Sequence, residues 1–287
     1  MPLAEMKDRT PVSLPRCDFH ALPTVARHAV TRFTGPVTAA HNRGDGTRPG
    51  LAAVLETLAG NVFVKGIPAA DPRAAFLAEE AAAHPHLPAV CPRLLWQAEA
   101  GGWCLAGHEF IDGRPADYGP DSRDLVAVLA ALGELQEAAL PAGTDIGTAE
   151  RRWAAWAPEG TAHLFAGRTP LHADLAPDDV LVDADGRVRV TGWSRPTAGA
   201  PWIDPYLLAL RMVEAGQGPG YAVTWVRRLA SWRTADPKAV AAFAAAITRA
   251  RRERADAEPA PERTAGARHA ARLERFLAAS PWALPSN

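Results

Sequence analysis

The stretch from Thr169 to Asp204, TPLHADLAPDDVLVDADGRVRVTGWSRPTAGAPWID, decides the predicted fold of this chain. It contains two short β-prone runs, Val180 to Val182 and Arg187 to Thr191, which are separated by an Asp185-Gly186 pair. Asp-Gly between two such runs is one of the stronger local signals for a hairpin. We therefore expect a β-hairpin whose base holds the polar segment before it in a fixed position.

That polar segment carries the residues that could take part in catalysis or metal binding. They are His172, Asp174, Asp178 and Asp179, and the run Val190-Thr191-Gly192-Trp193 follows the second strand. This order resembles the catalytic segment of the aminoglycoside phosphotransferase family, the antibiotic-kinase branch of the protein-kinase-like fold. That family has H-G-D-x-x-x-x-N before the hairpin and D-W or D-F after it.

The resemblance implies a role for each matched position. His172 and Asp174 would be the catalytic residues, with Asp174 as the base that faces the acceptor hydroxyl. Asp179 stands where the family has a magnesium-binding Asn, and a carboxylate is itself a good magnesium ligand. Gly192 stands where the family has its principal magnesium-binding Asp, and it has no side chain to offer. Asp204 matches an acid that braces the catalytic loop.

Candidate nucleotide-binding residues lie upstream. Gly44 and Gly46 belong to a polar loop between two predicted strands, and glycine lets backbone N–H groups approach phosphates closely. The run Val62-Phe63-Val64-Lys65 resembles the kinase strand whose lysine meets the α- and β-phosphates. Taken singly, the loop fits an ordinary hairpin connection, and the lysine fits a solvent-exposed residue of an edge strand. The order of loop, strand, lysine and helix favours a kinase.

Two further segments fit this order. Asp71-Pro72 predicts a helix start, with Asp as N-cap and Pro at the first position. On that helix, the resemblance implies a glutamate partner for the strand lysine, either Glu80 or Glu79, although both glutamates could equally be exposed surface residues. Glu109, Phe110 and Ile111 resemble the hinge segment whose backbone receives adenine, which implies ATP as the nucleotide.

The pattern of elements predicts an α+β, bilobal protein-kinase-like fold with a strand-rich N-lobe and a mainly helical C-lobe. We assign residues 1–17 to an N-terminal tail, 18–108 to a nucleotide-binding-like N-lobe and 109–287 to the C-lobe, which contains the 169–204 hairpin. Within the C-lobe, the spacing of apolar residues predicts helices over 201–215, 220–231, 237–254 and 264–279.

Composition narrows the class of protein. The chain has 287 residues and a net charge of −1, so neither nucleic acid nor an anionic membrane is expected as a partner. Its three cysteines are far apart and form no metal-binding or disulfide pattern. The first 15 residues lack the apolar core of a signal peptide, and we expect a cytoplasmic protein.

Two functional interpretations follow from Gly192. In the first, the chain is a degenerate, pseudokinase-like protein that binds a ligand or a partner protein. In the second, it is an active ATP-dependent phosphotransferase for a hydroxyl of a small molecule or peptide, with Asp174 as base and Mg²⁺ held by Asp179. The first interpretation also predicts that Gly192→Asp improves magnesium-dependent ATP binding.

Overall fold

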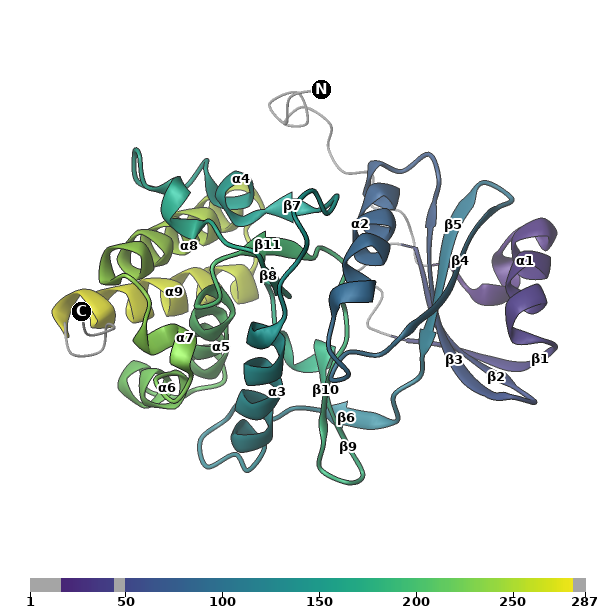
Figure 1. Ribbon diagram of the computed structural model, residues 1–287, viewed down its shortest axis with the longest axis horizontal. Helices are drawn as coiled ribbons and strands as arrows, with labels where there is room; N and C mark the ends of the chain where they lie inside the picture. The colour runs from purple at the N-terminus through teal and green to yellow at the C-terminus, as the bar shows by residue number, and fades with distance from the viewer. Residues whose placement is uncertain (1–16, 44–49, 281–287) are drawn as a thin grey trace. The chain divides into compact units, whose positions relative to one another are not determined.

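The computed structural model describes residues 17–43 and 50–280. These residues form two compact units. The first contains the described residues up to Ala78 together with Arg93–Phe110, and the second contains Glu79–Pro92 and the chain from Ile111 onward. The chain is α+β, as predicted, with strands concentrated in the first unit and helices in the second (Figure 1).

A five-stranded antiparallel sheet is the framework of the first unit, in the order β1-β2-β3-β5-β4. Its strands are β1 (Val37–Asn42), β2 (Leu51–Thr57), β3 (Gly60–Pro68), β4 (Leu94–Ala100) and β5 (Trp103–Glu109). The sequence predicted a strand-rich N-lobe, and the run Val62-Phe63-Val64-Lys65 lies within β3.

Helix α1 (Thr24–Thr34) packs against β4 of this sheet. Its buried residues Ala26 and Val30 join an apolar cluster with Val64 of β3. At the end of the helix, the ring of Phe33 stacks on Trp96 with the centroids 5.0 Å apart.

Helix α2 begins where the Asp71-Pro72 pair predicts a helix. The Asp71 side chain accepts a hydrogen bond from the Arg73 N–H, and a 3₁₀ turn, Pro72–Ala74, leads into α2 (Ala75–Ala83). The division between the two units falls inside this helix, between Ala78 and Glu79.

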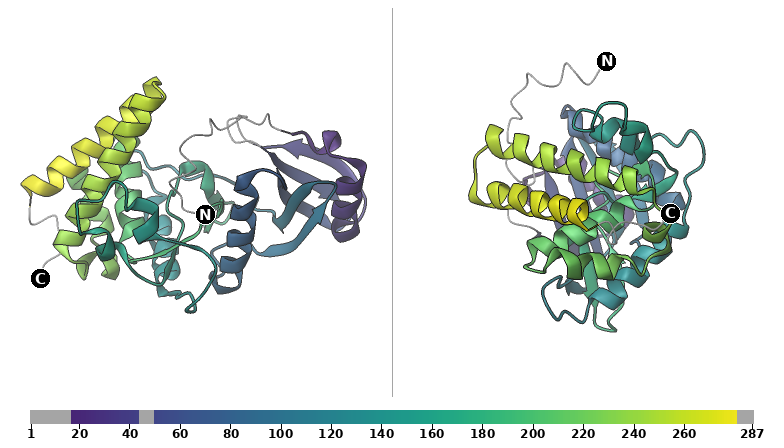
Figure 2. Two further views of the ribbon diagram at one scale, coloured as in Figure 1. Left: turned by 90° about the horizontal axis from the view of Figure 1, so that it is seen from above. Right: turned by 90° about the vertical axis from the view of Figure 1, so that its left-hand side faces the viewer.

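Helices make up most of the second unit. They are α3 (Leu125–Glu137), α4 (Ala149–Trp153), α5 (Ile203–Glu214), α6 (Pro219–Val226), α7 (Ala230–Arg233), α8 (Pro237–Ala257) and α9 (Pro261–Ala279). Helices α8 and α9 lie side by side, as the views in Figure 2 show. The single helix predicted over 220–231 is wrong: it is two helices, because Leu229 adopts an extended conformation between α6 and α7.

The core of the second unit is built around Phe243 of α8. Edge-to-face contacts surround its ring, with centroid distances of 4.8 to 5.6 Å to Trp153, Phe165, Trp202 and Tyr206. Aromatic rings prefer this geometry because the positive edge of one ring meets the negative face of the next. Trp153 is therefore part of this core.

The predicted hairpin is present. Strands β9 (Val180–Asp183) and β10 (Val188–Val190) pair antiparallel, and β6 (Gly113–Pro115) adds to the other edge of β9. In the turn, the Asp183 carboxylate accepts the backbone N–H groups of Asp185 and Arg187, both at 2.9 Å. A second small sheet, β7-β11-β8, was not predicted; its strands are Gly147–Thr148, Thr197–Gly199 and Thr169–Leu171, too short to show periodicity.

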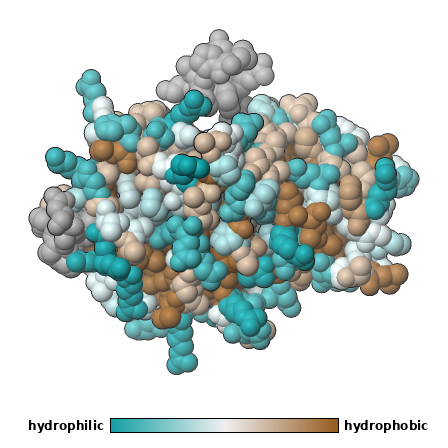
Figure 3. Space-filling model, in the orientation of Figure 1, coloured by the Kyte–Doolittle hydropathy of each residue, from teal (hydrophilic) through white to brown (hydrophobic). Residues whose placement is uncertain are grey.

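The surface is mixed in character. On the face shown in Figure 3, hydrophobic residues occur in small groups between hydrophilic ones. Among the described residues, no helix combines the length and the apolar composition that crossing a bilayer requires.

Candidate functional site

The HxD loop, which we define as residues 172–179, connects β8 to β9 in the second unit. Two of its residues, Ala173 (φ 64°) and Leu175 (φ 55°), have left-handed backbone conformations on either side of Asp174. Such conformations are unfavourable for residues with a side chain, so surrounding contacts must hold the loop in place.

Asp204 supplies the first of these contacts. It lies in the first turn of α5, is 1% exposed, and accepts hydrogen bonds from the backbone N–H groups of His172 (2.8 Å) and Ala173 (2.9 Å). Burial raises the pKa of the Asp204 carboxyl, and this effect is opposed by His172 and by the two backbone donors. Asp204 therefore stabilises the bend that presents Asp174, as the bracing role predicts.

His172 is the second contact, and its hydrogen bonds define its tautomer. The Leu175 N–H donates to Nδ1 over 2.9 Å, so Nδ1 is an acceptor. Nε2 then carries the proton and donates to the Thr191 carbonyl, 2.8 Å away. Both ring nitrogens are thus bonded to backbone, and the ring packs edge-on against Trp193. This geometry makes His172 a residue that positions the loop; the predicted catalytic role remains a prediction.

Asp174 forms an ion pair that the sequence did not predict. Its carboxylate accepts from Nη2 of Arg211 on α5, and Nε of the same guanidinium donates to the Asp174 carbonyl over 3.1 Å. The Asp174 side chain is 43% exposed, whereas that of Arg211 is 23% exposed. The pair is therefore at the surface of the unit and accessible to a ligand.

The charges continue from Arg211 along α5 and across to α8. Nη1 of Arg211 donates to Glu214 over 2.7 Å, and Glu214 is also paired with Arg251 of α8. Asp174, Arg211, Glu214 and Arg251 thus form a chain of alternating charge. Such a chain holds the Arg211 guanidinium in place on both sides.

A second guanidinium lies beside the loop. Arg152 of α4 donates from Nη2 to the Ala173 carbonyl (3.3 Å), and from Nη1 to the Arg195 carbonyl (3.1 Å) and the Thr197 hydroxyl (2.8 Å). Burial, with a smaller contribution from Arg195, lowers the pKa of Arg152 to about 10. Asp174 opposes this shift, so its carboxylate lies in the field of both guanidinium groups.

Asp179 and Gly192 are in direct contact. Gly192 has a positive φ of 74°, and a Cβ added to it would lie 2.2 Å from Oδ1 and 2.9 Å from Cβ of Asp179. Asp179 is 7% exposed and fills the space that a side chain at position 192 would need. A side chain at position 192 would therefore force the Asp179 side chain to move, and the expectation that Gly192→Asp improves magnesium-dependent ATP binding stays a prediction.

Of the candidate nucleotide-binding residues, Lys65, Glu109 and Phe110 belong to the first unit. Lys65 lies in β3, opposite Ala52 of β2 and Ala106 of β5. Glu109 ends β5, where its carboxylate accepts from the Arg93 N–H over 3.2 Å. Phe110 and Ile111 follow, and the division between the units falls between them. Gly44 and Gly46 lie outside the described residues.

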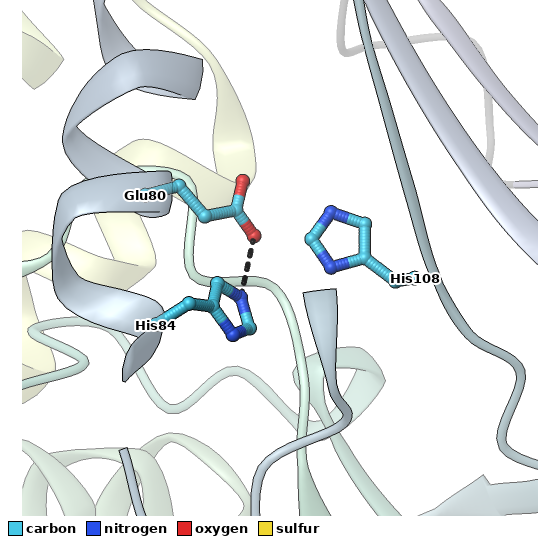
Figure 4. A group of neighbouring side chains, drawn as sticks. All are labelled: Glu80, His84 and His108. Carbon is cyan, nitrogen blue, oxygen red and sulfur yellow. Dashed lines mark ion pairs between the residues drawn. The ribbon is translucent and has the colours of Figure 1, made fainter. Parts of the chain in front are cut away.

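Glu80 is the predicted lysine partner on α2. It is 2% exposed, and its Oε1 lies 3.7 Å from Nε2 of His84 one turn later (Figure 4). The alternative that both helix glutamates are exposed is wrong for Glu80. Glu79 is only half-buried, and burial raises the pKa of its carboxyl.

The residues that sequence reasoning missed are Arg211 and Arg152. One signal for Arg211 exists: it follows Asp204 by seven residues, which places both on the same face of a helix. Arg152 had no comparable signal, because α4 is short and its approach to the loop depends on tertiary packing.

Comparison with solved structures identifies the fold. An aminoglycoside phosphotransferase from Alicyclobacillus acidocaldarius aligns with 91% of this chain and 96% of its own, at 14% identity and a TM-score of 0.63. A choline kinase from Streptococcus pneumoniae aligns with 88% and 98%, at 13% identity and a TM-score of 0.54. An aminoglycoside phosphotransferase in complex with ADP and hygromycin B aligns with 86% and 97%, at 14% identity and a TM-score of 0.58.

No family model matches the sequence, and no curated protein matches it. At these identities the structural likeness establishes the fold. The predicted bilobal, protein-kinase-like fold, shared with aminoglycoside phosphotransferases, is confirmed.

Proposed function

We propose that this chain is a degenerate kinase-fold protein that binds a ligand or partner at the HxD loop and does not transfer phosphate. One observation carries the proposal: the Asp174 carboxylate is ion-paired with Arg211. A general base must accept the proton of the attacking hydroxyl on a carboxylate oxygen. A guanidinium that donates to this carboxylate competes for that position.

The metal site supports the same proposal. Magnesium in phosphoryl transfer is held by one or two carboxylates, by the nucleotide phosphates and by water. At this loop Gly192 provides no carboxylate, and the space beside it is filled by Asp179. Asp179 is therefore the one side chain of the predicted metal site that could bind magnesium. The nearby carboxylate of Asp174 is already paired with Arg211.

The contact between Asp179 and Gly192 also favours a second candidate function. A carboxylate is still present beside position 192, although it comes from Asp179. In that case the chain is an ATP-dependent phosphotransferase for a hydroxyl of a small molecule or peptide, with Asp174 as base and Asp179 holding Mg²⁺. The predicted nucleotide-binding residues would be Gly44, Gly46, Lys65, Glu80, Glu109, Phe110 and Ile111. The neighbour solved with ADP supports ATP as the nucleotide.

Thermal unfolding with ATP, with and without Mg²⁺, separates the two functions. A ligand at about 100 times its Kd adds about 2.7 kcal/mol to the free energy of unfolding, which is a rise in Tm of about 5 °C for a domain of this size. The proposed function predicts that Mg²⁺ adds nothing to any shift that ATP causes. A magnesium-dependent rise that Asp179→Ala removes, and that the exposed neighbour variant Asp178→Ala retains, would instead support the phosphotransferase.

A further inference from the structure

The Arg152 guanidinium has a positive charge without a hydrogen-bonded carboxylate among the described residues. Its hydrogen bonds go to neutral oxygens, those of Ala173, Arg195 and Thr197. One face of the group lies over the Trp153 ring, with Cζ 4.9 Å from the centroid. A guanidinium has donors on Nε, Nη1 and Nη2, and here Nη1 and Nη2 make all of these bonds. Arg152 is thus fixed in position by bonds that leave its Nε donor unused, and the carboxylates of Asp174, Asp204 and Glu79 act on its charge only through space.

Arg211 contacts the next residue of the same backbone segment. Arg152 bonds to the Ala173 carbonyl, and Arg211 bonds to the carbonyl and carboxylate of Asp174. Because Glu214 and Asp174 both hold Arg211, its guanidinium is oriented before any ligand arrives. Two guanidinium groups fixed around one loop residue are well suited to recognise a carboxylate or a phosphate, which bind arginine through two parallel hydrogen bonds.

The geometry points to an anionic ligand: we propose that Arg152 and Arg211 bind a carboxylate or phosphate group of the small molecule that this protein recognises at the HxD loop. The inference rests on the proposed function, because it gives the chemical class of the ligand for the same loop. The low pKa of Arg152 supports it, since an incoming anion would offset the burial and the repulsion from Arg195 that lower this pKa.

The same arrangement disfavours a polycationic ligand. A polycation at this loop would meet the positive charges of Arg152 and Arg211 as well as the Asp174 carboxylate. The cationic groups of such a ligand would be repelled by the two guanidinium groups, and this repulsion is stronger for partly buried charges than for fully solvated ones. Aminoglycosides are polycations, so the loop of this chain is expected to reject them although its fold is shared with aminoglycoside phosphotransferases.

Inorganic phosphate is the probe for this site. The Tm is measured at increasing phosphate concentrations, at constant ionic strength and without nucleotide or Mg²⁺. Wild type is expected to show a saturable rise. Arg152→Gln should raise the phosphate concentration at half-saturation at least about tenfold, because it removes a charge-assisted interaction. The matched control is Arg151→Gln, which removes the same charge from the exposed neighbouring residue and should leave half-saturation unchanged. Equal behaviour of all three proteins would overturn the proposal, since it would mean that phosphate acts only as a general stabilising salt.

Asp174→Asn provides a second test if Arg152→Gln fails to fold. It removes the carboxylate that competes with the anion for Arg211, so phosphate should bind several-fold more tightly. Unchanged or weaker binding would contradict the site. A parallel titration with ATP identifies the source of the anion: if Arg152→Gln weakened ATP as much as phosphate, the occupant would be the nucleotide and the proposal would be wrong. Because the phosphate titration contains no ATP, its failure is distinguishable from a failure of the proposed function.

Discussion

Asp204→Ala is expected to lower the free energy of unfolding by about 3 kcal/mol. The substitution leaves the N–H groups of His172 and Ala173 without their acceptor, at a position where the carboxylate is 1% exposed. A buried donor without a partner costs about 1 to 3 kcal/mol. Part of this cost is offset because the variant no longer buries a carboxylate, and that burial is unfavourable, as the raised pKa of Asp204 indicates. Urea denaturation measures the difference.

The hairpin turn offers a matched control for this prediction. Asp183 also accepts two backbone N–H groups through its side chain, but it does so in an exposed turn. Water replaces the lost acceptor there, so Asp183→Ala should cost about 1 kcal/mol or less. Equal losses in the two variants would mean that burial of Asp204 does not brace the loop.

Gly192→Ala is expected to destabilise the protein by about 3 kcal/mol, for two separable reasons. A residue with a side chain in the left-handed conformation costs about 1 to 2 kcal/mol, and φ at Gly192 is 74°. The added Cβ would also overlap the Asp179 side chain at 2.2 Å, which forces a rearrangement that costs about 1 to 3 kcal/mol.

Gly186 separates these two contributions. It lies in the turn of the same hairpin with φ 78°, and a Cβ there meets nothing within 4 Å. Gly186→Ala therefore reports the conformational cost alone, about 1 kcal/mol. In an Asp179→Ala background, Gly192→Ala should cost about 1 kcal/mol less than in wild type, because part of the obstructing side chain is gone. Additive effects in this double-mutant cycle would contradict the contact.

Sequence was sufficient where a signal is local. The Asp-Gly turn predicted the β9–β10 hairpin, and the Asp71-Pro72 pair predicted the start of the helical segment before α2, because these structures depend on a few adjacent residues. The same local signals placed His172 and Asp174 in one loop. The bracing contact of Asp204 came from resemblance, and the structure shows the two hydrogen bonds that make it.

Sequence was insufficient where a contact joins distant segments. The partner of Asp174 lies 37 residues later on α5, and Arg152 reaches the loop from an element of five residues. The closeness of Gly192 to Asp179 depends on the register of the hairpin and on a positive φ, which no residue type alone specifies. These tertiary contacts place the guanidinium groups of Arg152 and Arg211 beside the loop.

The most direct test of this account is the release of phosphate from ATP in a single turnover, with the protein in excess over labelled ATP and Mg²⁺ present. Wild type is compared with Asp174→Asn, which removes the charge that a base requires but preserves the shape of the side chain. The account predicts that both proteins release phosphate at the same rate as buffer alone. A faster, magnesium-dependent release by wild type that Asp174→Asn abolishes would contradict it and would establish an active phosphotransferase.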